Sequence, residues 1–353
     1  MKLMKSLHLK DKFLKLPIIQ GGMGIGVSRC RLAGAVAKEG GMGVLSTAQI
    51  GYDDPDFAKN PEETNLRVLP EQIKKAKEIA GGNGMVAVNI MAVTQLYETY
   101  VKTACAAGVD AIISGAGLPT ELPKFAEGYN VALAPIVSST KSANVILKFW
   151  DKKYHRTADF LVIEGPLAGG HLGFSKEQLE DIPSLDYDTE IQNIIALKQT
   201  YEEKYQTTIP VFVAGGIFTA KDAAHVMELG ADGIQAATRF VATEECDASD
   251  AYKQAYVNAS DEDVIIIKSP VGMPGRAIKN TFIERMLAAP DKISHCFNCL
   301  KACNPATAPY CITQALINAV VGDLDNGLIF CGSRVGEITK ITTVPKLMQE
   351  LTV

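Results

Sequence analysis

The sequence predicts an α/β fold in which eight parallel strands, each followed by a helix, close into a barrel. Short runs rich in Val and Ile alternate with longer amphipathic segments along residues 17–236, a pattern typical of a parallel sheet covered by helices. Eight such units fit a (β/α)8 TIM barrel. The pattern changes after about residue 240, where we expect a smaller, mainly helical subdomain.

Eight short apolar runs are the predicted barrel strands. They lie at 17–20, 43–46, 85–90, 111–114, 131–137, 160–165, 210–216 and 233–236. An open doubly wound sheet is the alternative. Its strand count would be high, however, and the turn "QGGMGIG" after the first strand lacks the G-x-G-x-x-G spacing.

The predicted helices follow the strands, and three parts of the chain can be separated. Barrel helices are expected at 28–40, 94–107, 120–128, 139–154, 188–206 and 219–230. A further helix, between the second and third strands, is expected to end at about residue 80. Ser28 is the expected cap of the first helix, and Gly40 its end. We assign 1–240 to the barrel, 241–320 to the helical subdomain and 321–353 to a segment that returns to the barrel. Within the subdomain we expect helices at 242–260 and 276–290 and a strand at 264–271.

Composition narrows the class of protein. The chain has 353 residues, 47% of them hydrophobic and 21% charged, with a net charge of −5. No basic excess exists to bind a nucleic-acid backbone. No signal peptide and no apolar run of about 18 residues are evident, so no membrane association is expected. Eight cysteines in such a chain suggest reduced thiols or metal ligands. We therefore expect a cytoplasmic protein that acts on a small molecule, with a homodimer as one compatible assembly.

Small residues gather where the predicted strands end, which is the functional end of such barrels. Gly215 and Gly216 follow the seventh strand, and Ala237 and Thr238 follow the eighth. Their amides and the Thr238 hydroxyl could ring an anion, because these two loops form the usual phosphate site of the fold. The alternative for each glycine is a tight turn, and for Thr238 a helix cap.

Five motifs in order, "PIIQGGMG", "VNIM", "AGGHLG", "VFVAGGI" and "GADGIQAATRF", resemble the nitronate monooxygenase family. That family includes FMN-dependent enoyl-ACP reductases of the second type and NAD(P)H:quinone reductases. The resemblance implies FMN at the carboxyl ends of the strands, with NAD(P)H as a co-substrate in the reductases. The implied cofactor-binding residues are Gly22 and Met23 against the flavin ring, Asn89 at its edge or ribityl chain, Gly169 and Gly170 along the ribityl side, Gly215, Gly216, Ala237 and Thr238 at the phosphate, together with Gln235.

His171 stands among glycines after the sixth strand, in "EGPLAGGHLG". A neutral imidazole accepts a proton and its cation donates one. The resemblance implies that this histidine is the catalytic base toward nitroalkanes or orients the nitronate, or that it assists C=C reduction in the reductases. A purely structural histidine is the alternative. Residues 174–190 lengthen the loop that follows, as a lid or as surface elaboration.

Four cysteines form a cluster in "HCFNCLKACNPATAPYC". Cys296, Cys299, Cys303 and Cys311 follow C-x2-C-x3-C-x7-C, a candidate for an iron–sulfur cluster or a zinc ion. The first three also resemble the cluster motif of FMN-dependent enoate and dienoyl reductases. Four reduced, partly buried thiols are the alternative.

Three functions are compatible with these observations. The first is an FMN-dependent monooxygenase that oxidises alkyl nitronates with O2. The second is an NAD(P)H-dependent FMN reductase of enoyl thioesters or quinones, which an iron–sulfur centre would favour. The third is a non-catalytic flavin electron carrier, which would have no need of His171 as a proton-transfer group.

Overall fold

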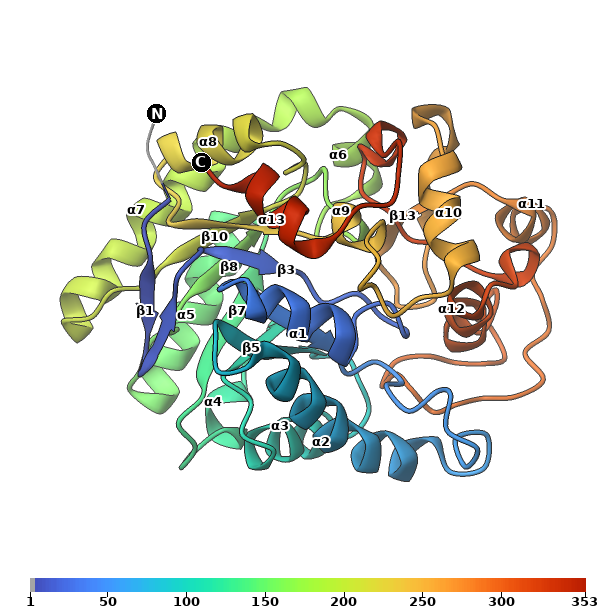
Figure 1. Cartoon of the computed structure of the whole chain (residues 1–353), viewed down its shortest axis with the longest axis horizontal. Helices are drawn as coiled ribbons and strands as arrows, with labels where there is room; N and C mark the ends of the chain where they lie inside the picture. Colours follow the sequence, from blue (N-terminus) through green and yellow to red (C-terminus); the bar gives the residue numbers. More distant parts are fainter. Residues whose placement is uncertain (1–3) are drawn as a thin grey trace.

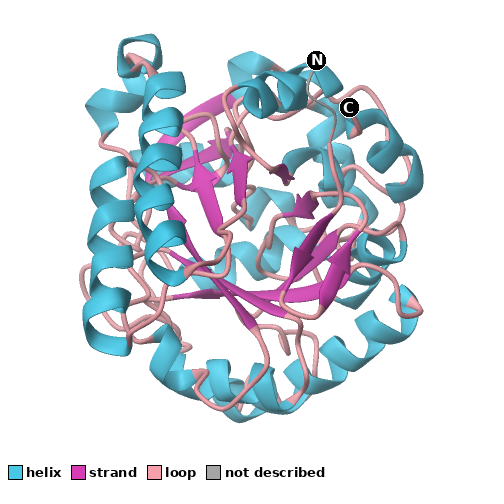
Figure 2. Ribbon diagram, turned by 90° about the vertical axis from the view of Figure 1, so that its left-hand side faces the viewer, coloured by secondary structure: helices cyan, strands magenta, loops and turns pink. Residues whose placement is uncertain are grey.

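A closed barrel of eight parallel strands forms the centre of the computed structural model, which describes residues 4–353 (Figures 1 and 2). In chain order the strands are β3 (Ile18–Gln20), β4 (Met42–Ser46), β5 (Met85–Met91), β6 (Ala111–Gly115), β7 (Ala132–Val137), β8 (Leu161–Glu164), β10 (Val211–Ala214) and β11 (Gly233–Ala236). The barrel closes where β11 pairs with β3. The predicted (β/α)8 fold and its eight strands are therefore confirmed.

A ring of helices encloses the barrel, as Figure 2 shows. The helices between strands are α1 (Cys30–Lys38), α2 (Pro61–Ala80), α3 (Tyr97–Ala106), α4 (Leu122–Phe125), α5 (Thr140–Tyr154), α7 (Tyr187–Tyr205) and α8 (Ala220–Glu228). The C-terminal helix α13 (Val344–Leu351) packs against α1, α8 and the short helix α9 (Thr238–Val241). The end of the chain thus returns to the barrel wall. In the described part of the chain, no helix has the length and apolarity that a membrane span requires.

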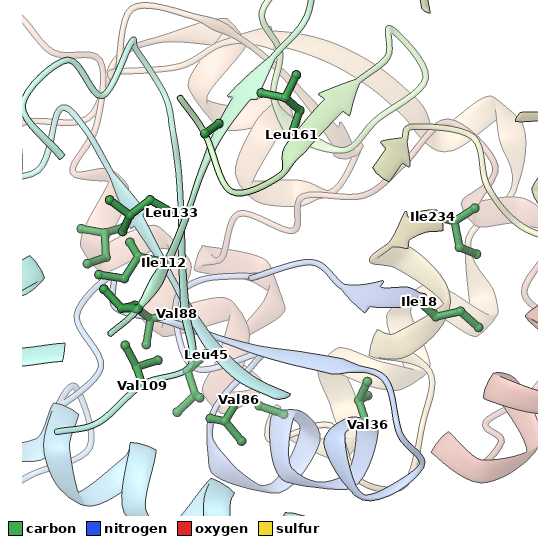
Figure 3. Close-up of a cluster of buried hydrophobic side chains, with 14 of the residues drawn as sticks. Ile18, Val36, Leu45, Val86, Val88, Val109, Ile112, Leu133, Leu161 and Ile234 are labelled. Atoms are coloured by element: carbon green, nitrogen blue, oxygen red, sulfur yellow. The ribbon is translucent and has the colours of Figure 1, made fainter. Parts of the chain in front are cut away.

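Side chains point alternately outward and inward along the barrel strands, and this divides the core into two layers. Outward residues such as Ile18, Leu45 and Val88 pack beneath the helices, and Figure 3 shows part of this layer. Inward residues such as Ile19 and Ile113 fill the barrel. Each fully buried Leu, Ile or Val contributes roughly 1.5–3 kcal/mol. The two layers therefore hold the strand ends, and whatever projects from them, in fixed positions.

A hairpin closes the amino-terminal end of the barrel. Strands β1 (Leu7–Leu9) and β2 (Lys12–Leu14) pair antiparallel, and Leu9 and Leu14 join the inner core. In Figure 1 this hairpin lies on the side opposite the C-terminal subdomain. One mouth of the barrel is thus filled with apolar side chains, which leaves the other mouth for a ligand.

The segment after the barrel strands builds the wall around that open mouth. Its elements are α10 (Asp250–Asn258), β12 (Val264–Lys268), β13 (Pro274–Ile278), α11 (Thr281–Ala288) and α12 (Ile312–Val321). Strand β13 also pairs with β9 (Gly170–His171), a two-residue strand in the loop after β8. Short turns of helix lie at α6 (Lys176–Glu180), Ile182–Leu185, Asp261–Asp263, Leu324–Asn326 and Val335–Glu337. The division into 1–240, 241–320 and 321–353 stays a prediction.

Two expected helices in this segment are wrong in extent. The stretch 276–290 begins as a strand, because β13 pairs with β12 on one side and β9 on the other, and helix starts only at Thr281. The stretch 242–260 is helical only over Asp250–Asn258. In both cases pairing and packing at long range override local helix propensity.

The cap of α1 also differs from the prediction. Arg29, not Ser28, is the N-cap residue, and its side chain makes no capping bond. Asp247 takes over this role from 218 residues away, with carboxylate oxygens 2.8 Å from the Arg29 amide and 3.1 Å from the Leu32 amide. The carboxylate satisfies helix-end amides that would otherwise be unpaired.

Replacing Asp247 by Ala should lower the free energy of unfolding by roughly 1–2 kcal/mol, because the amides of Arg29, Arg31 and Leu32 lose their side-chain acceptor. Urea denaturation followed by circular dichroism measures this. Asp11→Ala, at an exposed hairpin position, is the control. An equal effect of the two substitutions would contradict the capping role.

Candidate active site

A cavity of about 280 Å³ opens at the carboxyl ends of the barrel strands. Barrel loops supply its glycine-rich side, and the C-terminal subdomain supplies apolar side chains such as Leu300, Leu316 and Phe330. All eleven residues expected to be catalytic or to bind the cofactor line it: Gly22, Met23, Asn89, Gly169, Gly170, His171, Gly215, Gly216, Gln235, Ala237 and Thr238. The structure thus brings together residues from five barrel strands or the loops that follow them.

His171 is held in place by the subdomain. It pairs with Gly275 across β9 and β13. Its Nε2 shares a hydrogen bond of 2.8 Å with the Ser269 hydroxyl, and its ring meets the Phe330 ring edge-on at 5.0 Å between centroids. The imidazole therefore has a fixed orientation at the cavity wall. Ser269 and Phe330 carry no motif, and sequence reasoning missed them.

Burial sets the charge of this imidazole. Loss of solvent lowers the pKa of His171 to about 4, because the cationic form is disfavoured away from water. Among residues 4–353, no carboxylate forms an ion pair with the ring to offset that effect. His171 is consequently neutral near pH 7 and can accept a proton.

Gly169 and Gly170, in the loop after β8, are each suited to glycine for a different physical reason. A Cβ on Gly169 would lie 2.5 Å from the backbone carbon of Cys331, so this glycine permits close approach of the subdomain. Gly170 has φ +68, a backbone conformation that favours glycine, and a Cβ there would meet only open space. Open space beside a cavity-lining glycine leaves room for a flat ligand.

The loops after β10 and β11 meet the C-terminal segment at one end of the cavity. The Gly332 amide donates to the Thr238 hydroxyl at 2.9 Å, and Arg334 donates to the Gly216 carbonyl at 3.1 Å. The Ser333 hydroxyl lines the cavity here and is buried without a hydrogen-bond partner. A buried polar group of this kind normally has a partner, and an anionic phosphate would provide one. Ser333 was not among the expected site residues and lies outside the motifs quoted above.

The four clustered cysteines are not arranged as a metal-binding group in residues 4–353. In the part of the chain that the structure describes, no three His, Cys, Asp or Glu side chains are arranged to hold a metal ion. Cys296 is exposed, whereas Cys299 lines the cavity and packs against the apolar cluster around Leu300 and Tyr310. Metal-bound thiolates converge on one point about 2.3 Å away. The expected metal role of Cys296, Cys299, Cys303 and Cys311 is therefore not supported by this arrangement.

The loop extension does not cover the cavity. No residue between 174 and 190 lines it. Phe174 and Leu179 instead pack with Ala168 and Leu172 behind the loop after β8. This packing supports surface elaboration and not a lid.

Comparison with known proteins gives a consistent family. The nitronate monooxygenase family matches residues 6–353. A probable nitronate monooxygenase from Staphylococcus saprophyticus is 26% identical over 301 residues, covering 79% of this chain and 80% of that protein. One from Staphylococcus aureus strain Newman is 26% identical over 292 residues, covering 77% and 78%.

Solved structures agree with this fold. FabK from Thermotoga maritima is 25% identical with a TM-score of 0.70, covering 97% of this chain and 93% of that one. A nitroalkane oxidase from Streptomyces ansochromogenes, 20% identical with a TM-score of 0.69, covers 96% and 95% and shares the fold. Together with the cavity and the eleven expected residues among those that line it, these matches show that the chain belongs to the nitronate monooxygenase family and is an FMN-dependent oxidoreductase.

Proposed function

We propose that this enzyme oxidises alkyl nitronates with O2, using FMN, and that His171 is the base that takes the α-proton of a neutral nitroalkane to form the nitronate. The observation that supports the proposal most directly is a neutral imidazole, oriented by Ser269 and Phe330, at the wall of the cofactor-sized cavity. The family match over nearly the whole chain supports the same chemistry.

The cavity residues fit FMN. Ser333, with its unpartnered hydroxyl, Thr238 and the loop at Gly215 and Gly216 would hold the phosphate, and Asn89 and Gln235 would meet the ring system. The residues that line the remaining cofactor surface are Gly22, Met23, Gly169, Gly170 and Ala237. When bound, FMN accepts an electron pair from the substrate and gives it to O2.

His171 would act on the substrate in two ways. Its neutral ring can take the proton from the carbon next to a nitro group, with the Ser269 hydroxyl keeping the ring in place. A nitronate anion beside the ring would raise the pKa of His171, because an opposite charge favours the cation. Proton uptake and anion binding therefore support each other at this wall.

A second candidate is NAD(P)H-dependent reduction of enoyl thioesters or quinones. The apolar subdomain wall, with Leu300, Leu316 and Phe330, suits an elongated apolar substrate. The similarity to FabK points in the same direction. An iron–sulfur centre would strengthen this candidate, but the cysteine geometry does not support one. A homodimer and a cytoplasmic location stay predictions.

Anaerobic mixing of the FMN-loaded enzyme with substrate separates the two candidates. An alkyl nitronate should bleach the flavin absorbance within the enzyme's turnover time, whereas NADH and NADPH should not. Stopped-flow absorbance measures both. Rapid bleaching by a pyridine nucleotide, with none by the nitronate, would replace the first proposal with the second.

Replacing His171 by Gln should lower kcat with a neutral nitroalkane by about 10²–10⁴-fold while FMN remains bound, because the group that takes the α-proton to form the nitronate is lost. Turnover and flavin absorbance are measured on the same sample. His225→Gln is the control, since His225 is exposed on α8 and pairs with Asp188. Unchanged kcat in the His171 variant would remove the catalytic assignment of this histidine.

The protonation state of His171 can be measured directly. Because burial lowers its pKa to about 4, the native ring gains a proton only well below the unperturbed pKa of about 6.5. In ¹⁵N-histidine NMR, the ring signals of the ligand-free enzyme should stay constant from pH 8 to 5, with His171→Gln identifying them. A midpoint near pH 6.5 would show that the ring is not desolvated.

A further inference from the structure

We propose that Glu164 is a further cofactor-facing residue, whose carboxyl, when protonated, donates a hydrogen bond to FMN. Ionisation of this one side chain would then weaken FMN binding. The inference needs FMN binding alone and does not depend on which substrate the enzyme uses.

Strand register places Glu164 at the top of the barrel interior. Ala214 of β10 pairs with Glu164 of β8 on one side and with Gln235 of β11 on the other. Register partners in a parallel sheet present their side chains to the same face, and Ala214 belongs to the inner core. Glu164 and Gln235 therefore face the barrel axis with only a methyl group between them.

Asn89 reaches the same layer from the other side of the barrel. It pairs with Ile113 of β6, which also belongs to the inner core. Asn89, Glu164 and Gln235 all line the cavity. Three polar side chains thus form the floor of the cofactor cavity, and Glu164 is the one among them that can ionise.

No cation compensates this carboxyl. In residues 4–353, the carboxyl oxygens of Glu164 have neither an ion pair nor a hydrogen bond. Its register partner on β10 is Ala214, and the β7 pairing ends one residue earlier, at Val137 with Ile163. An ionised carboxylate here would lack any partner, which is costly in a site removed from water.

The titratable groups around Glu164 form their hydrogen bonds and ion pairs with other partners. Tyr187 of α7 donates to the Glu164 backbone carbonyl at 3.0 Å and to that of Ser138. Glu190, also on α7, accepts from the Thr140 amide. The cations nearest in the fold are engaged too: Arg276 of β13 donates to the Ala168 carbonyl, and Arg334 binds Asp222 and Glu337.

Burial accordingly raises the pKa of Glu164 to about 7, with desolvation as the cause. The pKa values of two other cavity groups lie far from 7, because burial lowers the pKa of His171 to about 4 and raises that of Cys331 to about 12. Glu164 thus changes charge near neutral pH. The protonated carboxyl offers one donor, which suits the carbonyl oxygens and ring nitrogens of a flavin.

The sign of the pH effect follows from these states. Below the raised pKa the carboxyl is protonated and donates to the flavin. Above it, the donor is lost and an anion faces the flavin oxygens. If only the protonated form binds well, FMN affinity falls about tenfold for each pH unit above the pKa. The FMN phosphate itself ionises near pH 6, so wild type must be compared with a variant at each pH.

Fluorescence titration of the FMN-depleted protein between pH 5.5 and 9 tests the proposal. The dissociation constant of wild type should rise relative to that of Glu164→Gln by about tenfold or more between pH 6 and 9. Gln keeps a donor at every pH, so its own profile should show only the phosphate effect. Glu177→Gln, exposed on α6 in the same connection, should behave as wild type.

A second measurement covers the case in which Glu164→Gln folds poorly. In infrared difference spectra on FMN binding at pH 7, wild type should show a protonated-carboxyl band that Glu164→Met lacks. Parallel pH profiles for wild type and Glu164→Gln, or no such band in wild type, would overturn the proposal. Because no substrate is present in either experiment, these outcomes are separate from failure of the nitronate oxidation proposal.

Discussion

The pairing of β9 with β13 is the interaction on which the site depends. Two residues, Gly170 and His171, leave the loop after β8 and pair with Gly275 and Arg276 of the subdomain. Arg276 also donates to the Ala168 carbonyl, so the loop is fixed at two adjacent points. This attachment turns a glycine-rich loop into a rigid wall, and it brings Ser269 and Phe330 to the imidazole. Preorganisation of this kind is what a catalytic group requires.

Removal of water by the same subdomain determines the charges in the cavity. A barrel alone would leave its mouth open to solvent, and the titratable groups there would keep ordinary pKa values. With the subdomain in place, burial makes His171 neutral and raises the pKa of Glu164 to about 7. Burial favours the uncharged form of both groups for one reason: it makes His171 a proton acceptor at neutral pH and makes the protonated, donor form of Glu164 accessible near pH 7.

Much of the site could be predicted because barrel geometry brings the carboxyl ends of all the strands together at one mouth. Gly22, Asn89, Gly215 and Thr238 lie far apart in sequence, yet each follows or ends a strand, and parallel strands end at the same mouth. Ser269 and Ser333 could not be found in this way. They come from irregular connections of the subdomain, whose position depends on packing and not on a repeating pattern. The metal role of the four clustered cysteines stays a prediction, since spacing limits which thiols can meet and residues 4–353 hold no group arranged to bind a metal ion.

The sequence by itself determined the barrel, its cofactor loops and the histidine, because hydrophobic period, glycine placement and motif order are local properties. Tertiary structure alone decided the helix cap supplied by Asp247, the strand formed by residues 274–278 and the charge state of the cavity. The cap and the pairing of β13 with β9 join segments about a hundred residues or more apart, although β13 also pairs with the preceding β12, and the charge state arises from exclusion of water by many residues together. Such properties belong to the packed molecule, and no short stretch of the chain encodes them.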